Sequence, residues 1–164
     1  MKVFDSLKKK AEESKKVIVF PEGNDDRIIK AAVRLEKEGI VKPLLLGKPD
    51  EVIKTAQSLN VDLGSIEIIN PAVYPDFEKM CQDFVELRKG KNTLAEAKEI
   101  LQDVSYFGTM LVYEGKADGM VSGATHSTAN TVRPALQIIK TKKGMSRVSG
   151  AMIMERGDEE YIFA

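Results

Sequence analysis

The residues best suited to chemistry lie in the segment GATHSTANTVR, residues 123–133. Pro134 follows this segment directly and limits where a helix can begin, because proline is tolerated in the first helical turn but clashes deeper in a helix. This predicts a helix that begins near Asn130 or Thr131, either of which is a favoured N-cap residue. Apolar residues then recur with the spacing of a helix that has one buried face, at Val132, Ala135, Leu136 and Ile139.

A loop that leads from a strand into such a helix is a good place to bind an anion. Backbone N–H groups are free at a helix N-terminus, and the positive end of the helix dipole favours negative charge. Hydroxyl groups in the loop add donors, and a planar guanidinium can hold a phosphate with two hydrogen bonds. The only histidine of the chain also lies in the loop, where it can hydrogen-bond a substrate or a neighbouring carbonyl. We therefore predict a phosphate site built from Gly123, His126, Ser127, Thr128 and Arg133.

A purely structural interpretation of the same loop is also open. Gly, Ser, Thr and Asn connect strands to helices in many α/β proteins, where a hydroxyl serves as a helix cap. A metal site is not expected, because His126 is accompanied by no second His and by no suitably spaced Cys.

Alternating strands and helices must position this loop. Apolar runs at 17–20, 43–47 and 66–69 predict buried parallel strands, and a further strand is expected at 119–122. Helical patterns lie between and around these runs, so we predict an α/β fold with a mostly parallel sheet flanked by helices. Ligands bind such sheets beyond the carboxyl ends of the strands, where the 123–130 loop would lie.

Two further segments bear on the site. The loop after the first strand, PEGNDDR at 21–27, carries three acids, which argue against phosphate contact; helix capping with an Asp–Arg pair is at least as plausible as a functional role. The clearest helical stripe covers 77–88 and predicts that Cys81 is a core residue. This helix ends at Arg88, whose charge is explained on sequence alone by the helix dipole.

Composition limits the class of partner. The 164 residues are 43% hydrophobic and 30% charged, as in a soluble globular protein, and 25 Lys and Arg balance 25 Asp and Glu. No overall field attracts nucleic acid or an anionic membrane. No apolar run has the length of a membrane span, and the single cysteine fits a reducing compartment. We expect a cytoplasmic protein with neither nucleic acid nor membrane as partner.

The last residues are expected to begin a second domain. Residues 1–144 would form most of the first α/β domain, and 145–164 the start of the next. Within the latter, a strand is predicted at 146–154, a turn at 155–160 and a second strand from 161. That second strand would end with unpaired groups, so the natural chain is expected to continue.

Three blocks resemble the phosphate acetyl/butyryl transferase family: FPEGNDDRIIKAA (20–32), ELRKGK (86–91) and YFGTMLVYEGKADGMVSGATHSTANTVRPALQIIKTKKG (106–144). The resemblance implies a two-domain architecture of the isocitrate and isopropylmalate dehydrogenase type, of which this chain is the amino-terminal part. It also implies a substrate role for Arg88, because the arginine of that motif is associated with binding the anionic substrate.

The implied reaction interconverts acetyl phosphate plus coenzyme A with acetyl-CoA plus phosphate. Coenzyme A is then a substrate, no cofactor is needed, and a homodimer is expected. The resemblance places a serine, an arginine and an aspartate, the last as the base, beyond Ala164, so the catalytic residues of this chain are unknown and the chain alone is expected to be inactive. Three alternatives are a butyryl acyl group, a non-catalytic anion-binding or dimer-forming module, and a decarboxylating dehydrogenase, the last disfavoured because neither G-x-G-x-x-G nor a metal-binding cluster of acids is found.

Overall fold

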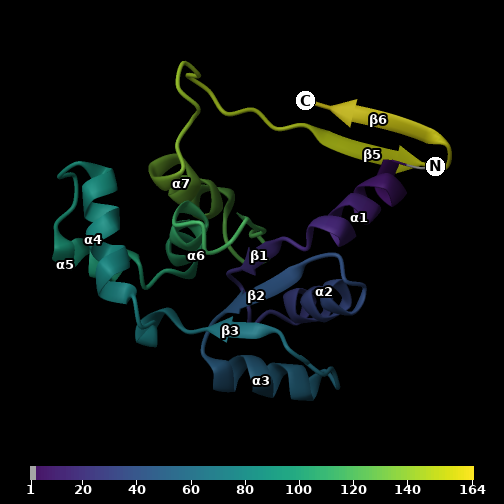
Figure 1. Ribbon diagram of the computed structural model, residues 1–164, viewed down its shortest axis with the longest axis horizontal. Helices are drawn as coiled ribbons and strands as arrows, with labels where there is room; N and C mark the ends of the chain where they lie inside the picture. Colours follow the sequence, from purple (N-terminus) through teal and green to yellow (C-terminus); the bar gives the residue numbers. More distant parts are fainter. Residues whose placement is uncertain (1–2) are drawn as a thin grey trace.

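The computed structural model describes residues 3–164 and shows a parallel sheet between two layers of helices, with a separate hairpin at the end of the chain (Figure 1). The helices are α1 (Val3–Ser14), α2 (Asp26–Lys37), α3 (Pro49–Ser58), α4 (Phe77–Arg88), α5 (Leu94–Ile100), α6 (Val104–Tyr113) and α7 (Thr128–Ile138), with a 3₁₀ turn η1 (Pro71–Val73). The strands are β1 (Val17–Phe20), β2 (Lys42–Leu46), β3 (Glu67–Ile69), β4 (Gly119–Met120), β5 (Met152–Arg156) and β6 (Glu159–Phe163). The predicted α/β fold is confirmed.

The main sheet has the strand order β3-β2-β1-β4, and every pair in it is parallel. The chain moves from β1 to β2 and β3 on one side, and β4 later joins the other side of β1. The carboxyl ends of β1 and β4 therefore face a topological switch point, where open α/β sheets bind ligands.

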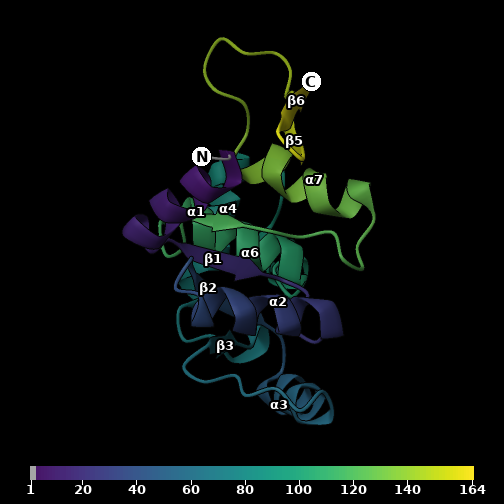
Figure 2. The same ribbon diagram turned by 90° about the vertical axis from the view of Figure 1, so that its right-hand side faces the viewer.

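The side chains of neighbouring residues on a strand point to opposite faces of the sheet. In β2, Leu44 and Leu46 enter one buried cluster while Leu45 enters the other. Helices α2 and α3 cover the face of Leu45, and α4 to α7 cover the opposite face (Figure 2). This explains why the strands read as continuous apolar runs in the sequence.

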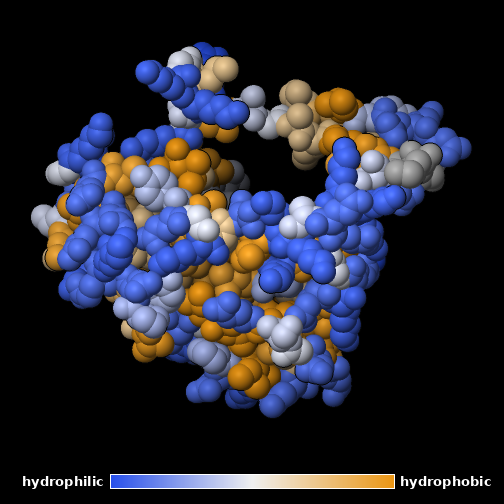
Figure 3. Space-filling view, in the orientation of Figure 1, coloured by the Kyte–Doolittle hydropathy of each residue, from blue (hydrophilic) through white to orange (hydrophobic). Residues whose placement is uncertain are grey.

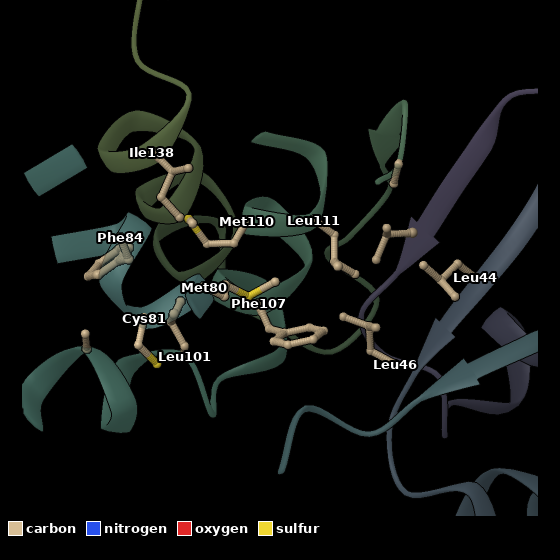
Figure 4. Close-up of a cluster of buried hydrophobic side chains, with 13 residues drawn as sticks. Leu44, Leu46, Met80, Cys81, Phe84, Leu101, Phe107, Met110, Leu111 and Ile138 are labelled. Atoms are coloured by element: carbon tan, nitrogen blue, oxygen red, sulfur yellow. The ribbon is translucent and has the colours of Figure 1, made fainter. Parts of the chain in front are cut away.

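The larger cluster holds α4, α5, α6 and α7 together (Figure 4). Phe84, Phe107 and Cys81 are completely buried in it, which confirms the predicted core position of the cysteine. Burial raises the pKa of the Cys81 thiol above its usual value. Helix α6 approaches the sheet closely at Gly108, where an added Cβ would lie 3.1 Å from a methyl carbon of Val19.

The hairpin of β5 and β6 differs from the prediction. Strand pairing extends to Arg156 and Glu159, so the turn contains Gly157 and Asp158 alone and not residues 155–160. Gly157 has a φ of 64°, which suits the tight turns that connect antiparallel strands. A hydrogen bond from the N–H of Val3 to Glu160 (3.3 Å) links the hairpin to α1. The proposed domain division after residue 144 stays a prediction.

None of the helices in residues 3–164 combines the length and the apolar character that crossing a membrane requires.

Candidate active site

Two loops meet at the switch point, one after β1 and one after β4. The first is held against the end of β2, because the N–H of Gly23 donates to the carbonyl of Leu46 (3.1 Å). A Cβ at position 23 would lie 2.5 Å from that carbonyl oxygen, so the close approach requires glycine. Glu22 is thereby fixed beneath the second loop.

The carboxylate of Glu22 is held by the backbone of residues 123–126. Its Oε2 accepts hydrogen bonds from the N–H groups of Gly123 (3.0 Å) and Ala124 (2.9 Å). Its Oε1 accepts from the N–H of Thr125 (2.6 Å), the Thr125 hydroxyl (3.0 Å) and the N–H of His126 (2.9 Å). Successive N–H groups that converge in this way form an anion-binding nest.

The nest strongly favours the ionised form of Glu22. Burial alone would raise the pKa of this carboxyl, but the hydrogen bonds from Thr125, Ala124 and His126 lower it to about 2. The Nδ1 atom of His126 also lies 2.9 Å from Oε1, as in an ion pair, although its direction does not meet the geometry of a hydrogen bond.

The loop after β4 therefore has the predicted anion-binding shape, but the anion is part of the protein. The prediction that the loop from Gly123 to Thr128 offers free N–H groups to a substrate is wrong for residues 123–126, because Glu22 accepts from them. The sequence pointed to the correct loop and missed its occupant. An acid directly after a buried strand was the available signal, but its use required knowing that β1 and β4 are neighbours.

The rest of the loop after β1 supplies the expected helix cap and Asp–Arg pair, but the N-cap is Asp25 and not Asn24, the residue that the sequence favoured for it. The Asp25 side chain caps α2 by accepting from the N–H groups of Arg27 and Ile28, and it pairs with the Arg27 guanidinium at 2.9 Å. Arg27 also donates to the carbonyl of Ala124 (2.7 Å), so this loop holds the nest from a second point.

Helix α7 begins earlier than predicted. Its N-cap is Ser127, whose hydroxyl accepts from the N–H of Asn130 (3.3 Å), and not Asn130 or Thr131. Pro134 consequently lies in the second turn, where it cannot donate to the carbonyl four residues back. A favourable serine cap and the burial of the proline ring offset that loss.

The buried face of α7 also differs from the prediction. Pro134 and Ile138 are buried, whereas the stripe expected inside is exposed, with Val132 at 41% and Leu136 and Ile139 at 48% each. This change of face follows from the packing of α7 on α6, which the sequence of α7 alone does not specify.

One of the predicted substrate residues, Arg133, lies beside Tyr106 of α6. Arg133 of α7 lines a cavity of about 230 Å³ together with Tyr106, Asn130 and two acids, Glu99 and Asp103. Burial raises the pKa of the Tyr106 hydroxyl, and the positive charges of Arg133 and Arg88 act in the opposite direction. Within residues 3–164, neither arginine forms an ion pair, although Arg88 donates to Asn92 (3.2 Å).

The other predicted residues lie apart from the two arginines. His126 lines a second cavity, of about 370 Å³, beyond the carboxyl ends of β1, β2 and β3. Ser127 and Thr128 are exposed at the start of α7, and Gly123 is exposed with a φ of 109°. The remaining polar residues of the larger cavity include Asn24, Lys48, Glu51, Asn70 and Gln102.

Comparison with known proteins assigns this sequence to a family. The sequence profile described as phosphate acetyl/butaryl transferase matches residues 2–164. The chain belongs to this family. Phosphate acetyltransferase of Staphylococcus aureus (strain MRSA252) is 57% identical over 146 residues, which is 89% of this chain and 44% of the relative. The phosphate acetyltransferase of Bacillus subtilis (strain 168) is 49% identical over 162 residues, 99% of this chain and 50% of the relative.

Solved structures of phosphotransacetylases have the same fold. The EutD phosphotransacetylase from Staphylococcus aureus superposes with a TM-score of 0.91 at 54% identity, over 98% of this chain and 48% of its own. A phosphotransacetylase from Streptococcus pyogenes gives a TM-score of 0.93 at 53% identity, over 100% of this chain and 51% of its own. This member of the phosphate acetyl/butaryl transferase family spans about half the length of the relatives it matches, and it corresponds to their amino-terminal part.

Proposed function

We propose that this chain supplies the amino-terminal half of an enzyme that transfers an acetyl group between phosphate and coenzyme A. In one direction, the thiol of coenzyme A attacks the acetyl carbon of acetyl phosphate, the carbon–oxygen bond to phosphate breaks, and the thiol proton is taken up by a base. The structural observation that carries the proposal is Arg133, a guanidinium group that forms no ion pair in residues 3–164 and lines a cavity together with Tyr106 and Asn130.

Such a reaction needs bound anions, an acceptor for the thiol proton and donors to the carbonyl oxygen. This chain would contribute anion binding through Arg133, Arg88, Ser127 and Thr128. The first N–H groups of α7 add to it, because the first turn of a helix leaves them without an intrahelical acceptor. The base and the oxyanion donors are proposed to lie in the other half of the enzyme.

The substrates in this proposal follow from the names of the relatives, and its remaining features are expectations from the family resemblance and the composition. Coenzyme A and acetyl phosphate are substrates, no cofactor takes part, and the enzyme is a cytoplasmic homodimer that binds neither nucleic acid nor membrane. A butyryl group is the alternative acyl group.

The proposal is tested with a hybrid enzyme, in which this chain replaces the matching amino-terminal part of the Streptococcus pyogenes phosphotransacetylase. The TM-score of 0.93 supports the exchange. We expect the hybrid enzyme to release phosphate from acetyl phosphate in the presence of coenzyme A, and the 164-residue chain alone to show no turnover. A folded hybrid enzyme without activity would contradict the proposed function, and an active 164-residue chain would contradict the assignment of the base to the other half.

The contribution of Arg133 can be measured in the same hybrid enzyme. Arg133→Ala should raise the KM for the anionic substrates about 10- to 150-fold, which corresponds to the loss of about 1.5 to 3 kcal/mol from hydrogen bonds to a charged group. Arg133→Lys should recover part of this loss, because an ammonium keeps the charge but not the planar fork. Arg34→Ala on α2, which removes an exposed guanidinium away from the site together with its ion pair to Glu38, is the control. Unchanged kinetics in both Arg133 variants would remove this residue from the site.

A further inference from the structure

The nest of residues 123–126 is closed to substrate by a side chain from elsewhere in the sequence. The Glu22 side chain is 1% exposed. It accepts five hydrogen bonds from this loop, and each of them joins residues about a hundred positions apart in the sequence. A carboxylate held in this way fixes four consecutive backbone N–H groups, and with them the path of the chain into α7.

We propose that Glu22 is a positioning residue, which acts as a built-in anion and sets the start of α7 so that Asn130 and Arg133 face the substrate cavity. The phosphate group of a substrate then binds beside Arg133 and not in the nest. The part of this proposal that concerns substrate rests on the proposed function, whereas the part that concerns the loop does not.

The contacts show how this influence reaches Arg133. His126, the last residue held by Glu22, is followed directly by Ser127, the N-cap of α7. Ser127 accepts from Asn130 through its hydroxyl and from Thr131 through its carbonyl (3.0 Å). The position of the nest thereby determines where the helix begins, and Arg133 lies in its second turn.

The nest can be emptied and refilled. Glu22→Ala removes the carboxylate and leaves the N–H groups of 123–126 facing a hole of similar size. The hole opens to solvent, because Glu22, Thr125 and His126 line the larger cavity of about 370 Å³. A small carboxylate such as formate can therefore take the place of the missing group.

The loop part of the proposal is tested by NMR on the 164-residue chain. In Glu22→Ala we expect the amide signals of residues 123–126 to shift and their hydrogen exchange to accelerate, and formate to reverse both changes in a saturable way. Glu86→Ala, which removes an exposed glutamate of α4, is the matched control and should show no response to formate. Amide signals that are unchanged in Glu22→Ala, or that do not respond to formate, would overturn the proposal.

A second variant covers the case in which Glu22→Ala does not fold. Glu22→Gln keeps the volume of the side chain but replaces one accepting oxygen by an NH2 group, which donates, so we expect lost exchange protection at residues 123–126 without rescue by formate. Protection equal to that of the natural chain would overturn the proposal.

The substrate part is tested by kinetics of the hybrid enzyme at a temperature well below its melting point. Glu22→Ala should raise the KM for acetyl phosphate by up to about 100-fold, as expected for a displaced binding group, and formate should lower it again. If the unmutated hybrid enzyme is inactive, the proposed function fails while the NMR result still decides the role of the nest. If the hybrid enzyme is active and Glu22→Ala leaves KM unchanged, the positioning role is refuted.

Discussion

A buried carboxylate that accepts five hydrogen bonds stabilises the fold only while it is ionised. The pKa of Glu22 falls from 4.5 to about 2 in the folded protein, a difference that corresponds to about 3 kcal/mol. Because the folded value is the lower one, this stabilisation is complete above pH 4.5 and is lost as the pH falls toward 2.

We therefore expect the free energy of unfolding of the unmutated 164-residue chain to exceed that of its Glu22→Gln variant by about 3 kcal/mol at pH 7. This difference should shrink below pH 4.5. Urea unfolding of both proteins between pH 7 and pH 3 measures it. Other carboxyl groups titrate equally in both proteins and cancel. A difference that stays constant with pH would show that Glu22 acts through its shape and not through its charge.

Cys81 should be chemically inert in the folded protein. Its thiol is completely buried, and burial raises its pKa, so little thiolate is available to react. A thiol reagent should label it at the rate of unfolding, and addition of urea should accelerate labelling. Rapid labelling of the native chain would contradict the core position of this side chain.

At the scale of single residues, the sequence indicated an anion-binding loop but did not identify Glu22 as the anion that its N–H groups hold. The substrate roles predicted for Ser127 and Arg133 rest on the general chemistry of a hydroxyl and a guanidinium, and they stay predictions. Glu22 was not recognisable as this anion, because an acid after a strand is also a common helix-capping residue. The contact with residues 123–126 depends on the pairing of β1 with β4, which is a property of the whole sheet.

At the scale of elements, the positions of β1 and β2 were predictable because both faces of the sheet are covered there and these strands are therefore largely apolar. Helix α7 was predicted less well. Its start was predicted too late, because proline was expected only in the first helical turn. The Ser127 cap and the burial of Pro134 outweigh the one hydrogen bond that proline cannot form. The hairpin turn was also predicted too long, because charged residues such as Glu155 and Glu160 pair across the strands as readily as they occupy turns.

The close approach of the β1 loop to β2 gives a prediction at this scale. Gly23→Ala places a Cβ 2.5 Å from the backbone oxygen of Leu46, so the loop must move. We expect the free energy of unfolding to fall by about 1 to 3 kcal/mol, the usual cost of overpacking, and the exchange protection of residues 123–126 to fall with it. Gly150→Ala, with no atom within 4 Å of the added Cβ, is the control for chemical denaturation. Equal stability of both variants would contradict the tight contact.

At the scale of the whole molecule, the chain consists of a packed sheet-and-helix body and an extended hairpin. Figure 3 shows the hairpin standing off from the body, with apolar side chains on its surface. Met152 is 68% exposed, Ile162 73% and Phe163 54%. A two-stranded hairpin is marginally stable by itself in water, so this part contributes little to the stability of the body.

Removal of residues 145–164 should consequently leave the thermal midpoint of the body almost unchanged. Loss of the apolar hairpin surface should also reduce self-association, because exposed apolar patches promote it. Differential scanning calorimetry and sedimentation velocity of the natural and shortened chains measure these two effects. A large fall of the midpoint would show that the hairpin packs on the body in solution.

The pairing of β1 with β4 also determines when the sheet and the nest can form during synthesis of the chain. β1 and Glu22 leave the ribosome early, but the N–H groups that Glu22 requires follow about a hundred residues later. Until then, β1 has one unpaired edge and Glu22 has none of these donors, and open strand edges favour aggregation of nascent chains. The carboxylate of Glu22, which organises the candidate site, therefore lacks its donors until residues 123–126 are synthesised, and the site can form only after His126 has emerged.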